Sequence, residues 1–566
     1  MSQRVLFTTI FRPFEVPGKY NLPGDEKFLD YFSNRLTREP GFYSLHDDHP
    51  TVAPHLIAAN VDADVTVLET PTIEEFKAEL GKGYDVVCIT FLTLHFTKLV
   101  HMIAWARKLA PDTKVVIGGF GTALFDLDRL DVDGVCQAEG IGYMRDFLGQ
   151  AAAEPVIHPI ITFDIKMRIG VQHPELPRKK VGVIVNGFGC PHACEFCSTS
   201  AYFGKKHVPL IRSGADLHGT MARYDAEAGV RDFVIYEEDF YLYKRHINDF
   251  IAAARGDSTL YSYACYATIK SLSLFDIEDL VDSGLSHVWI GVEAVDSPFN
   301  KSVGKPIREV FEALQRYGVT TTGSIIAGLD HHKKDNLEAE FAHLASLFPS
   351  TVQISNLIAG PGTPLRARLG SEGRLAGEPN LLDSHLYSDQ VIHPEFGKGE
   401  LRELIFKGYD YVYDAIGPAL YRIMKTWYGG SKTLRASPRE RLRARGEHLA
   451  RRASALRPVF LRTAEYLPND AIRANVAACL AEMEADIGAP SEAELAMADL
   501  FRAKFDAEKE RLAKEGAHVY SAGTRVATYT DRPFRAAGVP NIAARAPQKP
   551  RRAGFDVSLA RLHRST

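Results

Sequence analysis

The strongest constraint on the fold is an alternation of apolar, strand-like runs with helical stretches over residues 175–385. Six runs have the length and composition of buried parallel strands: KVGVIVNG, RDFVIYEED, LYSYACYAT, SHVWIGVEA, VTTTGSIIAG and STVQISNLIAG. Helical patterns lie between them, for example at 215–228, 245–255 and 307–317. Because crossovers between parallel strands are right-handed, six such repeats predict a partial (β/α)6 barrel with its active site at the carboxyl ends of the strands.

A second α/β region precedes the barrel. Five apolar runs alternate with helical patterns over residues 1–155 and predict a doubly wound, Rossmann-like sheet: RVLFTTI, DVTVLE, YDVVCITFL, TKVVIGG and DGVCQAEG. A proline-containing stretch up to residue 177 then marks a boundary. After the barrel the strand signal fades, which predicts a helical domain over 386–530 and a flexible basic tail over 531–566.

The composition limits the functional classes. The chain has 566 residues, seven cysteines and a net charge of −4, so the whole chain does not resemble a nucleic-acid-binding protein. No apolar run approaches the roughly 18 residues that a membrane span needs, and the N-terminus lacks a signal-peptide cleavage pattern. Sparse, odd-numbered cysteines favour a reducing compartment, and we expect a cytoplasmic protein.

Three of the seven cysteines fall within eight positions. Cys190, Cys194 and Cys197 form a C-x3-C-x2-C pattern in a glycine-bracketed loop after the first barrel strand. Three thiolates can hold a cubic 4Fe-4S cluster and leave one iron open for another ligand. A zinc site completed by His192 or His207 is the alternative, although zinc loops usually supply a second C-x2-C pair, which is absent here.

The loop CPHACEFC resembles the cluster motif of radical S-adenosylmethionine (SAM) enzymes. The segments IYEEDFYLYKR, GVEAVDS, GSIIAGLD and PGTPLRARLGSEGRL follow in the order expected for that family, so the resemblance covers about 175–385. It implies the three cysteines as ligands of a 4Fe-4S cluster that binds SAM through its open iron. Near the SAM ammonium group it implies an acidic residue among Glu237, Glu238 and Asp239, with Glu238 as our choice. Its other implied SAM contacts are Glu293, near the ribose, and Gly323 and Ser324, near the adenosine. The other four cysteines, 88, 136, 265 and 479, are predicted to be small buried residues.

The first region has small or hydroxyl residues where its strands end. These residues are Thr90, Thr93, Gly118, Gly119, Glu139 and Gly140. Doubly wound sheets bind ligands at the edge where their strands end. Because this region directly precedes a radical SAM core, it resembles the cobalamin-binding domain of cobalamin-dependent radical SAM enzymes. The resemblance implies bound cobalamin. No D-x-H-x-x-G stretch supplies a lower axial histidine, and His95 and His101 are expected to be exposed or to cap a helix.

The C-terminal region contains a basic, amphipathic stretch. Eight arginines lie between residues 435 and 457, together with leucines and an alanine at helical spacing. Such a helix can contact an anionic membrane surface or a protein partner, or it can pack on the barrel with a solvated basic face. The first alternative would place the protein on the cytoplasmic face of a membrane, with the basic tail as a second contact.

The resemblance as a whole implies a radical SAM enzyme that cleaves SAM and methylates an unactivated carbon with the help of cobalamin. The substrate would be a small molecule or a lipid, and a flavodoxin or ferredoxin would supply electrons. A non-methylating cyclisation or carbon–carbon bond formation, on a lipid or tetrapyrrole, is the alternative within enzymes. A non-catalytic cobalamin or redox sensor is the alternative outside them. Methylthiolation of tRNA is disfavoured because a second cysteine triad is absent.

Overall fold

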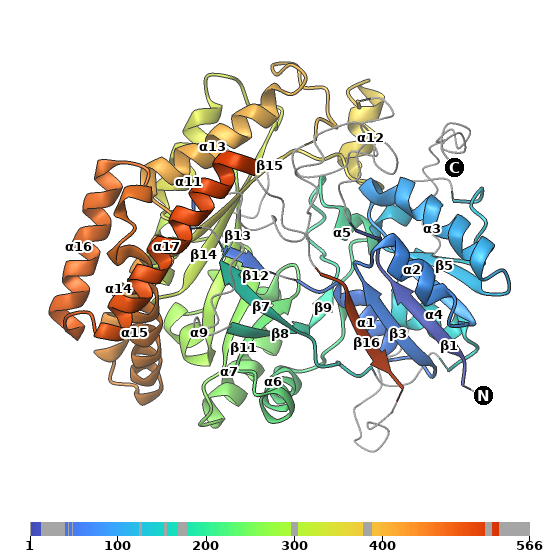
Figure 1. The fold of residues 1–566 in the computed structure, drawn as a ribbon, viewed down its shortest axis with the longest axis horizontal. Helices are drawn as coiled ribbons and strands as arrows, with labels where there is room; N and C mark the ends of the chain where they lie inside the picture. Colours follow the sequence, from blue (N-terminus) through green and yellow to red (C-terminus); the bar gives the residue numbers. More distant parts are fainter. Residues whose placement is uncertain are drawn as a thin grey trace.

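A computed structural model of the chain describes residues 2–12, 40–43, 45–47, 49–123, 127–137, 139–151, 156–167, 179–295, 304–376, 388–515 and 523–530. Figure 1 shows two α/β units side by side, with a group of long helices covering the far side of the larger one. Among the described residues, no helix combines the length and the apolar character that crossing a membrane requires. The predicted tail over 531–566 lies outside the described residues.

The N-terminal unit is built on five parallel strands with a sixth strand at one edge. The strands are β1 (Arg4–Thr8), β3 (Asp64–Glu69), β4 (Val86–Thr90), β5 (Lys114–Gly118) and β6 (Gly134–Cys136), in the spatial order β3-β1-β4-β5-β6. Four helices connect them: α1 (Val52–Ala58), α2 (Ile73–Leu80), α3 (Phe96–Leu109) and α4 (Gly140–Phe147). The chain leaves β1 in one direction and reaches β4 in the other, so the topological switch lies between these two strands.

The second unit is a curled sheet of six parallel strands in sequence order. They are β8 (Lys179–Val185), β11 (Asp232–Tyr236), β12 (Ser262–Ala267), β13 (Leu285–Glu293), β14 (Thr320–Ala327) and β15 (Thr351–Asn356). The outer helices include α6 (Gly214–Ala228), α7 (Lys244–Gly256), α9 (Ile277–Ser283), α10 (Ile307–Arg316) and α11 (Leu337–Ser346), and two short helices, α8 (Ile269–Leu272) and α12 (Pro364–Ser371), follow β12 and β15. The predicted partial (β/α)6 barrel is confirmed.

The barrel sheet is extended beyond its first strand. Two antiparallel strands, β7 (Thr162–Met167) and β2 (Leu45–Asp47), continue the sheet past β8. Strand β7 lies in the stretch that the sequence suggested was a boundary. Its short TFDIKM pattern is flanked by prolines, and pairing with β8 compensates for its weak intrinsic strand signal.

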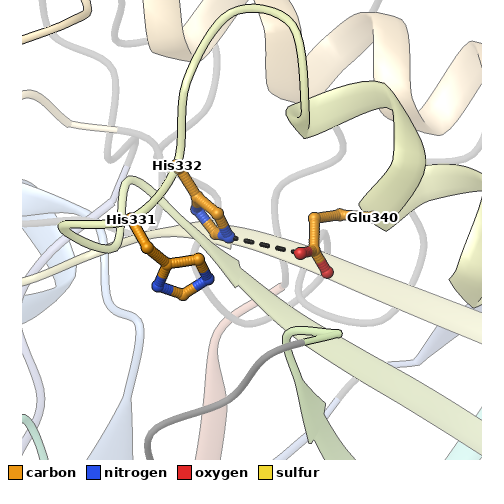
Figure 2. Close-up of side chains that lie close together, drawn as sticks. All are labelled: His331, His332 and Glu340. Atoms are coloured by element: carbon orange, nitrogen blue, oxygen red, sulfur yellow. Dashed lines mark ion pairs between the residues drawn. The ribbon is translucent and has the colours of Figure 1, made fainter.

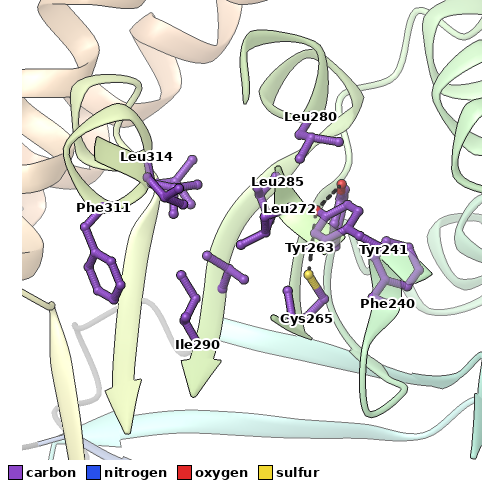
Figure 3. Close-up of a cluster of buried hydrophobic side chains, with 14 of the residues drawn as sticks. Phe240, Tyr241, Tyr263, Cys265, Leu272, Leu280, Leu285, Ile290, Phe311 and Leu314 are labelled. Carbon is purple, nitrogen blue, oxygen red and sulfur yellow. Dashed lines mark hydrogen bonds between the residues drawn. The ribbon is translucent and has the colours of Figure 1, made fainter. Parts of the chain in front are cut away.

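The main hydrophobic core lies between the barrel strands and their outer helices. Figure 3 shows part of it, with side chains of β12, β13 and the neighbouring helices in contact. Cys265 is 2% exposed, and its thiol donates to the Tyr241 hydroxyl at 3.7 Å. Cys88, Cys136 and Cys479 are also buried. The prediction that these four cysteines are buried residues is therefore confirmed.

Five long helices form the C-terminal part and pack against the outer helices and the last strands of the barrel. They are α13 (Glu400–Ile416), α14 (Ala419–Arg435), α15 (Glu440–Leu461), α16 (Asp470–Ile487) and α17 (Glu492–Glu515). Helix α13 covers the edge strand β15, where the Tyr409 hydroxyl accepts from Ile354 N–H at 2.9 Å and donates to Ile354 C=O at 3.2 Å. An edge that would otherwise expose unpaired backbone is thereby satisfied.

The end of the described chain returns to the first unit. Strand β16 (Arg525–Tyr529) pairs antiparallel with β3 of the N-terminal sheet, more than 400 residues away in sequence. Figure 1 shows it against the N-terminal sheet, remote from the helices that precede it. Strand β16 lies within residues 386–530, for which the sequence predicts a helical domain, because a single five-residue run carries no local signal for such a distant partner.

The arginines of α15 pair mostly within the molecule. Arg445 is buried and donates to the carbonyls of Tyr261 and Asp282, and Arg457 makes a bidentate pair with Glu494. Arg441 pairs with Asp282. Just before the helix, Arg439 pairs with Asp279, and Arg435 at the end of α14 pairs with Asp486. The helix therefore packs on the barrel through much of its basic face, which is the alternative that the sequence analysis set against membrane contact.

Candidate functional site

The cysteine loop follows the first barrel strand and is closed at its base by a short hairpin. Strand β9 (Gly187–Phe188) pairs with β10 (Val208–Pro209), and helix α5 (Ser198–Tyr202) lies between them. Gly189 has a φ of +80°, and a Cβ there would lie 2.1 Å from the Lys206 carbonyl, so only glycine fits. The Ser200 hydroxyl donates to the Cys190 carbonyl at 2.8 Å. These contacts fix the loop at the carboxyl edge of the barrel.

Two histidine–carboxylate pairs tie the loop to the second barrel strand. His192 lies 2.7 Å from Asp239, and His207 lies 2.8 Å from Glu237. Asp239 in turn accepts from the Thr268 and Ser271 hydroxyls beyond β12. Both histidines that could complete a zinc site are therefore engaged with carboxylates.

The stretch after β15 packs on the other side of the loop. A Cβ at Gly360 would lie 2.0 Å from the Ser198 hydroxyl, so the backbone approaches α5 as closely as it can. Leu365 N–H donates to the Glu195 carbonyl at 3.0 Å, and Phe196 packs in the small apolar cluster around Leu365 and Leu369. The cysteine loop, which follows the first barrel strand, is thus in contact with the segment that follows the last barrel strand.

The sulfur positions suit a cluster better than one metal ion. Among the described residues, only His331, His332 and Glu340 bring three potential ligand atoms within 4.8 Å of one another, so the three thiols are spread more widely. All three cysteines line one large cavity, and Cys190 is the most buried. Burial raises the pKa of the Cys190 thiol to about 12, with Asp239 and Cys197 adding to the effect. A thiolate here needs a bound cation, which an iron–sulfur cluster supplies.

Glu238 is the acidic side chain best placed to receive a cation beside the cysteine loop. It lines the same cavity, and its Oε2 is buried without a hydrogen-bond partner among the described residues. Burial raises the pKa of this carboxyl group. An ammonium group in the cavity would compensate for both effects, and the amino group of SAM fits that requirement. The neighbouring Glu237 and Asp239 are already bound to protein groups.

The other predicted SAM contacts have different surroundings. Glu293 ends β13 with a φ of +67°, and its carboxylate lies 2.4 Å from where a Cβ on Gly291 would be. The absence of a side chain at Gly291 therefore lets Glu293 fold back over the strand. Gly323 faces outward, because a Cβ there would meet Leu344 of α11 at 2.8 Å. Ser324 is half-buried, with its hydroxyl 3.4 Å from the Ile290 carbonyl. Glu293, Gly323 and Ser324 lie outside the set of residues that line the cavity.

A histidine–glutamate cluster fastens the ends of β13 and β14 (Figure 2). His332 Nδ1 accepts from the N–H groups of Gly328 and Leu329 at 3.1 and 3.2 Å, and its Nε2 lies 3.6 Å from Glu340. A neutral imidazole whose Nδ1 accepts hydrogen bonds carries its proton on Nε2. Since metal-bound histidines normally donate from the second nitrogen, this arrangement favours a structural role over metal binding. Glu340 also accepts from Val295 N–H at 2.8 Å.

The carboxyl edge of the N-terminal sheet opens onto the same cavity. Thr90, Gly118 and Gly119 line it at the ends of β4 and β5. Gly119 has a φ of +101°, and a Cβ there would lie 2.5 Å from the Phe91 carbonyl, so this glycine is required by the turn itself. Gly118 has only ordinary van der Waals neighbours. The edge therefore presents backbone and a hydroxyl group to the cavity.

The remaining predicted residues of this region are buried or already in contact with other protein groups. The Glu139 carboxylate accepts from the N–H groups of Ile141 and Gly142 and so caps α4, and a Cβ at Gly140 would meet Ile57 at 2.6 Å; both residues line the cavity. Thr93 is 8% exposed and does not line it. His95 and His101 are 6% and 5% exposed, and neither makes a capping bond. The expectation that they are exposed or capping was therefore wrong; burial lowers the pKa of His95 to about 3.

One cavity of about 1530 Å³ joins the two units and reaches the C-terminal helices. Beside the cavity, the two units are in contact through aromatic side chains. The ring centroid of Phe120, after β5, lies 4.9 Å from that of Tyr202 in α5. Single small-molecule sites usually have volumes of about 300–1,000 Å³. The cavity therefore has room for more than one ligand, with the cysteine loop on one side and the switch edge of the N-terminal sheet on the other.

The residues that line the barrel interior were not among those predicted from the sequence. Tyr236, Tyr266 and Trp289 face the cavity from three adjacent strands. Alternation in β11, β12 and β13 could have indicated which side chains point inward, but apolar or aromatic residues occur on both faces of these strands. Trp427 and Arg452 reach the cavity from α14 and α15, and no sequence pattern links those helices to the barrel.

A cysteine loop after the first strand of a parallel partial barrel, with a carboxylate at the next strand end, defines a cluster-binding barrel protein. Residues 184–343 match the sequence model of the family described as the radical SAM superfamily. The central part of the chain is therefore a radical SAM domain, as its resemblance predicted. The family implies a 4Fe-4S cluster and SAM as cofactors, and the cysteine loop and Glu238 fit both.

The curated relatives are methylases by name. The chain is 26% identical over 255 residues to a hopanoid C-2 methylase of Rhodopseudomonas palustris (strain TIE-1). The aligned region covers 42% of this chain and 48% of the relative. It is 22% identical over 194 residues to an uncharacterized methyltransferase of Pyrococcus horikoshii, covering 32% and 41%. The chain thus spans about half the length of the curated relatives it matches.

Solved structures give a more distant comparison. A radical SAM methyltransferase, TsrM, from Kitasatospora setae, solved with cobalamin and a [4Fe-4S] cluster, matches with a TM-score of 0.49 and 15% identity. The match covers 80% of this chain and 99% of TsrM.

Proposed function

We propose that the protein is a cobalamin-dependent radical SAM methyltransferase that methylates a carbon atom of a small molecule. The observation that carries the proposal is the single cavity shared by the cysteine loop and by the carboxyl edge of the N-terminal sheet at β4 and β5. A doubly wound sheet takes its ligand at this edge, and the shared cavity would bring that ligand next to the cluster. The names of the two curated relatives favour methyl transfer.

The residues of each part have defined tasks in this proposal. Cys190, Cys194 and Cys197 would hold the cluster, and Glu238 would pair with the SAM ammonium group. Thr90 and Gly118 would lie against cobalamin, where the absence of bulky side chains leaves room for a large planar ring. When bound, the cluster supplies the electron for reductive cleavage of SAM, and cobalamin supplies the methyl group. The protein itself contributes orientation and the exclusion of water.

The cobalamin fit has one further feature. Among the described cavity residues that precede β7, His49 is the single histidine, and its Nε2 lies 2.7 Å from the Tyr236 hydroxyl of the barrel. We therefore expect cobalamin to bind without an imidazole as its lower ligand. Membrane attachment is not part of the proposal, because most arginines of α15 pair within the molecule; a cytoplasmic location and a flavodoxin or ferredoxin donor remain expectations.

Anaerobic reconstitution with iron, sulfide and hydroxocobalamin tests the proposal. After desalting, the corrin absorbance should correspond to about one bound corrin per chain. When SAM and a reductant are added, the protein should release 5′-deoxyadenosine or S-adenosylhomocysteine. Retention of the cluster without any corrin would remove the methyltransferase assignment. Non-methylating cyclisation or carbon–carbon bond formation would then take its place.

A further inference from the structure

The shared cavity continues below the cysteine loop into the barrel, where side chains at two levels of the sheet face it. The upper level holds Tyr266, Trp289, Thr322 and Thr351, which are adjacent through the strand register, and Tyr236, whose ring stacks on Tyr266. The lower level holds Val234, Ala264, His287 and Thr320. This interior lies beyond the groups assigned to cluster, SAM and cobalamin, so it is available for the substrate.

One wall of the interior is a continuous aromatic surface. The rings of Tyr236 and Tyr266 stack with centroids 6.0 Å apart at 18°, and those of Tyr266 and Trp289 stack at 5.4 Å and 28°. Three nearly parallel rings on adjacent strands form a row across the sheet. Such a row favours an apolar body that can lie against aromatic faces.

Beside this row, the neighbouring part of the sheet is polar, but its groups satisfy one another. The two ring nitrogens of His287 lie 2.9 and 3.0 Å from the hydroxyls of Thr320 and Thr322, and Thr322 lies 2.6 Å from the hydroxyl of Thr351. Polar groups that are already paired do not require a polar ligand. The middle of the interior can therefore accept an apolar molecule without leaving hydrogen bonds unmade.

The lower end of the cavity differs, because Arg452 faces it. Arg452 lies 4.1 Å from the centre of the Trp427 ring, and its one ion pair among the described residues joins Nη1 to Asp232 Oδ1 at 3.9 Å. That distance exceeds a hydrogen bond. Other arginines of α15 with buried side chains, Arg445 and Arg457, bind carbonyls or a carboxylate directly. Lys180 lines the same end.

We propose that the substrate is an elongated molecule with an apolar, planar body along the aromatic row and an anionic end group bound by Arg452. The inference rests on the proposed function, which places the reacting carbon near the cysteine loop. Asp232, beside Arg452, and Glu238, beside that loop, are six residues apart along an extended segment, a span of about 20 Å at roughly 3.3 Å per residue. A guanidinium with unused donors in a low-dielectric cavity selects a carboxylate or phosphate.

Binding of a matched pair of fluorescent probes tests this. 1-Pyrenebutyric acid has a planar apolar body and a carboxylate, whereas 1-pyrenebutanol has the same body without the charge. Fluorescence anisotropy with the full-length protein, in the absence of SAM and cobalamin, should show the acid binding at least about tenfold more tightly. Arg452→Met should remove that preference and leave the alcohol unchanged. Arg451→Met is the matched control, because Arg451 is an exposed neighbour outside the cavity.

A second variant keeps the test decisive if Arg452→Met fails to fold. Asp232→Asn removes the carboxylate that competes for Arg452, so it should tighten binding of the acid a few-fold and leave the alcohol unchanged. Equal affinity for both probes in the wild-type protein, or no binding of either, would overturn the proposal. Because the assay requires neither corrin nor turnover, a failed cobalamin reconstitution would leave its result intact and identify the proposed function as the part that is wrong.

Discussion

The two α/β units use the same edge of a parallel sheet in different ways. In the barrel, the loops at the carboxyl edge are fastened by specific side-chain bonds, such as His192 to Asp239 and His207 to Glu237. In the N-terminal sheet, the corresponding edge presents Thr90, Gly118 and Gly119, with little beyond backbone.

The difference corresponds to what each edge would hold. Three thiolates around a cluster need fixed directions, so the barrel loop is held from both sides. A large ring with its own rigid shape needs space and backbone contacts more than directed ligands. A site that must hold its ligand in one geometry is recognised by hydrogen bonds and ion pairs between its side chains. A site that must make room for a large rigid ligand is recognised by small residues at its edge.

The largest effect should come from breaking the fastened site. Cys190→Ala, Cys194→Ala and Cys197→Ala should each reduce SAM cleavage to the level of a no-enzyme control, because each thiolate would hold one iron. Iron content and 5′-deoxyadenosine release measure this. Cys479→Ala, at a buried cysteine outside the cavity lining, is the control and should retain both. Undiminished iron and turnover in any one of the three variants would contradict the assignment.

The second prediction fills the open site. Thr90→Tyr should weaken cobalamin binding at least about 100-fold, since a clash of a few kcal/mol costs tenfold for each 1.4 kcal/mol. Cluster content and SAM cleavage without substrate should persist. Corrin absorbance after desalting measures the first effect. Thr97→Tyr, on α3 and outside the cavity, is the matched control; equal corrin retention by both variants would place cobalamin elsewhere or nowhere.

A smaller effect is expected at Glu238. Replacing it in Glu238→Gln keeps its shape but removes the charge that we assign to the SAM ammonium group, so SAM affinity should fall by about 30-fold. Corrin binding should not change. Equilibrium dialysis with SAM measures the loss, and Glu227→Gln, at an exposed position of α6 outside the cavity lining, is the control. Unchanged affinity in Glu238→Gln would assign the ammonium group to another acceptor.

The smallest effect concerns pH and the frame of the barrel. Burial lowers the pKa of His158 to about 4, and its Nε2 accepts from Val185 N–H at 2.8 Å. Between pH 6.5 and about 4 the unfolded chain binds a proton that the native protein does not. This contribution to stability is therefore present above pH 6.5 and is lost as the pH falls, by roughly 3 kcal/mol at most.

Urea unfolding at pH 7.5 and pH 5, followed by tryptophan fluorescence, measures this dependence; the three tryptophans include Trp289 in the barrel. His158→Gln should have a smaller difference between the two pH values than the wild-type protein. The same difference in both proteins would assign the acid sensitivity to other groups, such as the buried His95.

The sequence predicted the strands of both sheets because each parallel strand is a near-continuous apolar run. The cysteine loop was predicted because the C-x3-C-x2-C spacing alone indicates three thiolates that can bind one cluster. Strands β7 and β16 could not be predicted in the same way, since their stability comes from partners and not from their own residues. For Gly323 the sequence could not show which face of β14 its Cα presents, and the structure turns it toward α11.

Buried polar groups mark the limit of prediction within the site. Glu237, Glu238 and Asp239 are three adjacent acidic residues that the sequence cannot separate. Tertiary partners separate them: Glu237 and Asp239 are bound to histidine or hydroxyl groups, whereas one oxygen of Glu238 has no hydrogen-bond partner in the described part of the chain. In the same way, Arg452 differs from the other arginines of its helix only through what packs around it.

Strand β16 has a consequence for how the chain is made. Its partner β3 ends at Glu69, and β16 begins at Arg525, so the ribosome has to synthesise more than 400 residues between them. At roughly 5–20 residues per second, the N-terminal sheet keeps an unpaired edge for about half a minute to a minute and a half after β3 emerges. During this interval the edge can pair with another nascent chain on the same messenger RNA. Pairing of the first sheet is thus completed only after Tyr529 has been synthesised, and a protein truncated before Arg525 would keep that edge unpaired.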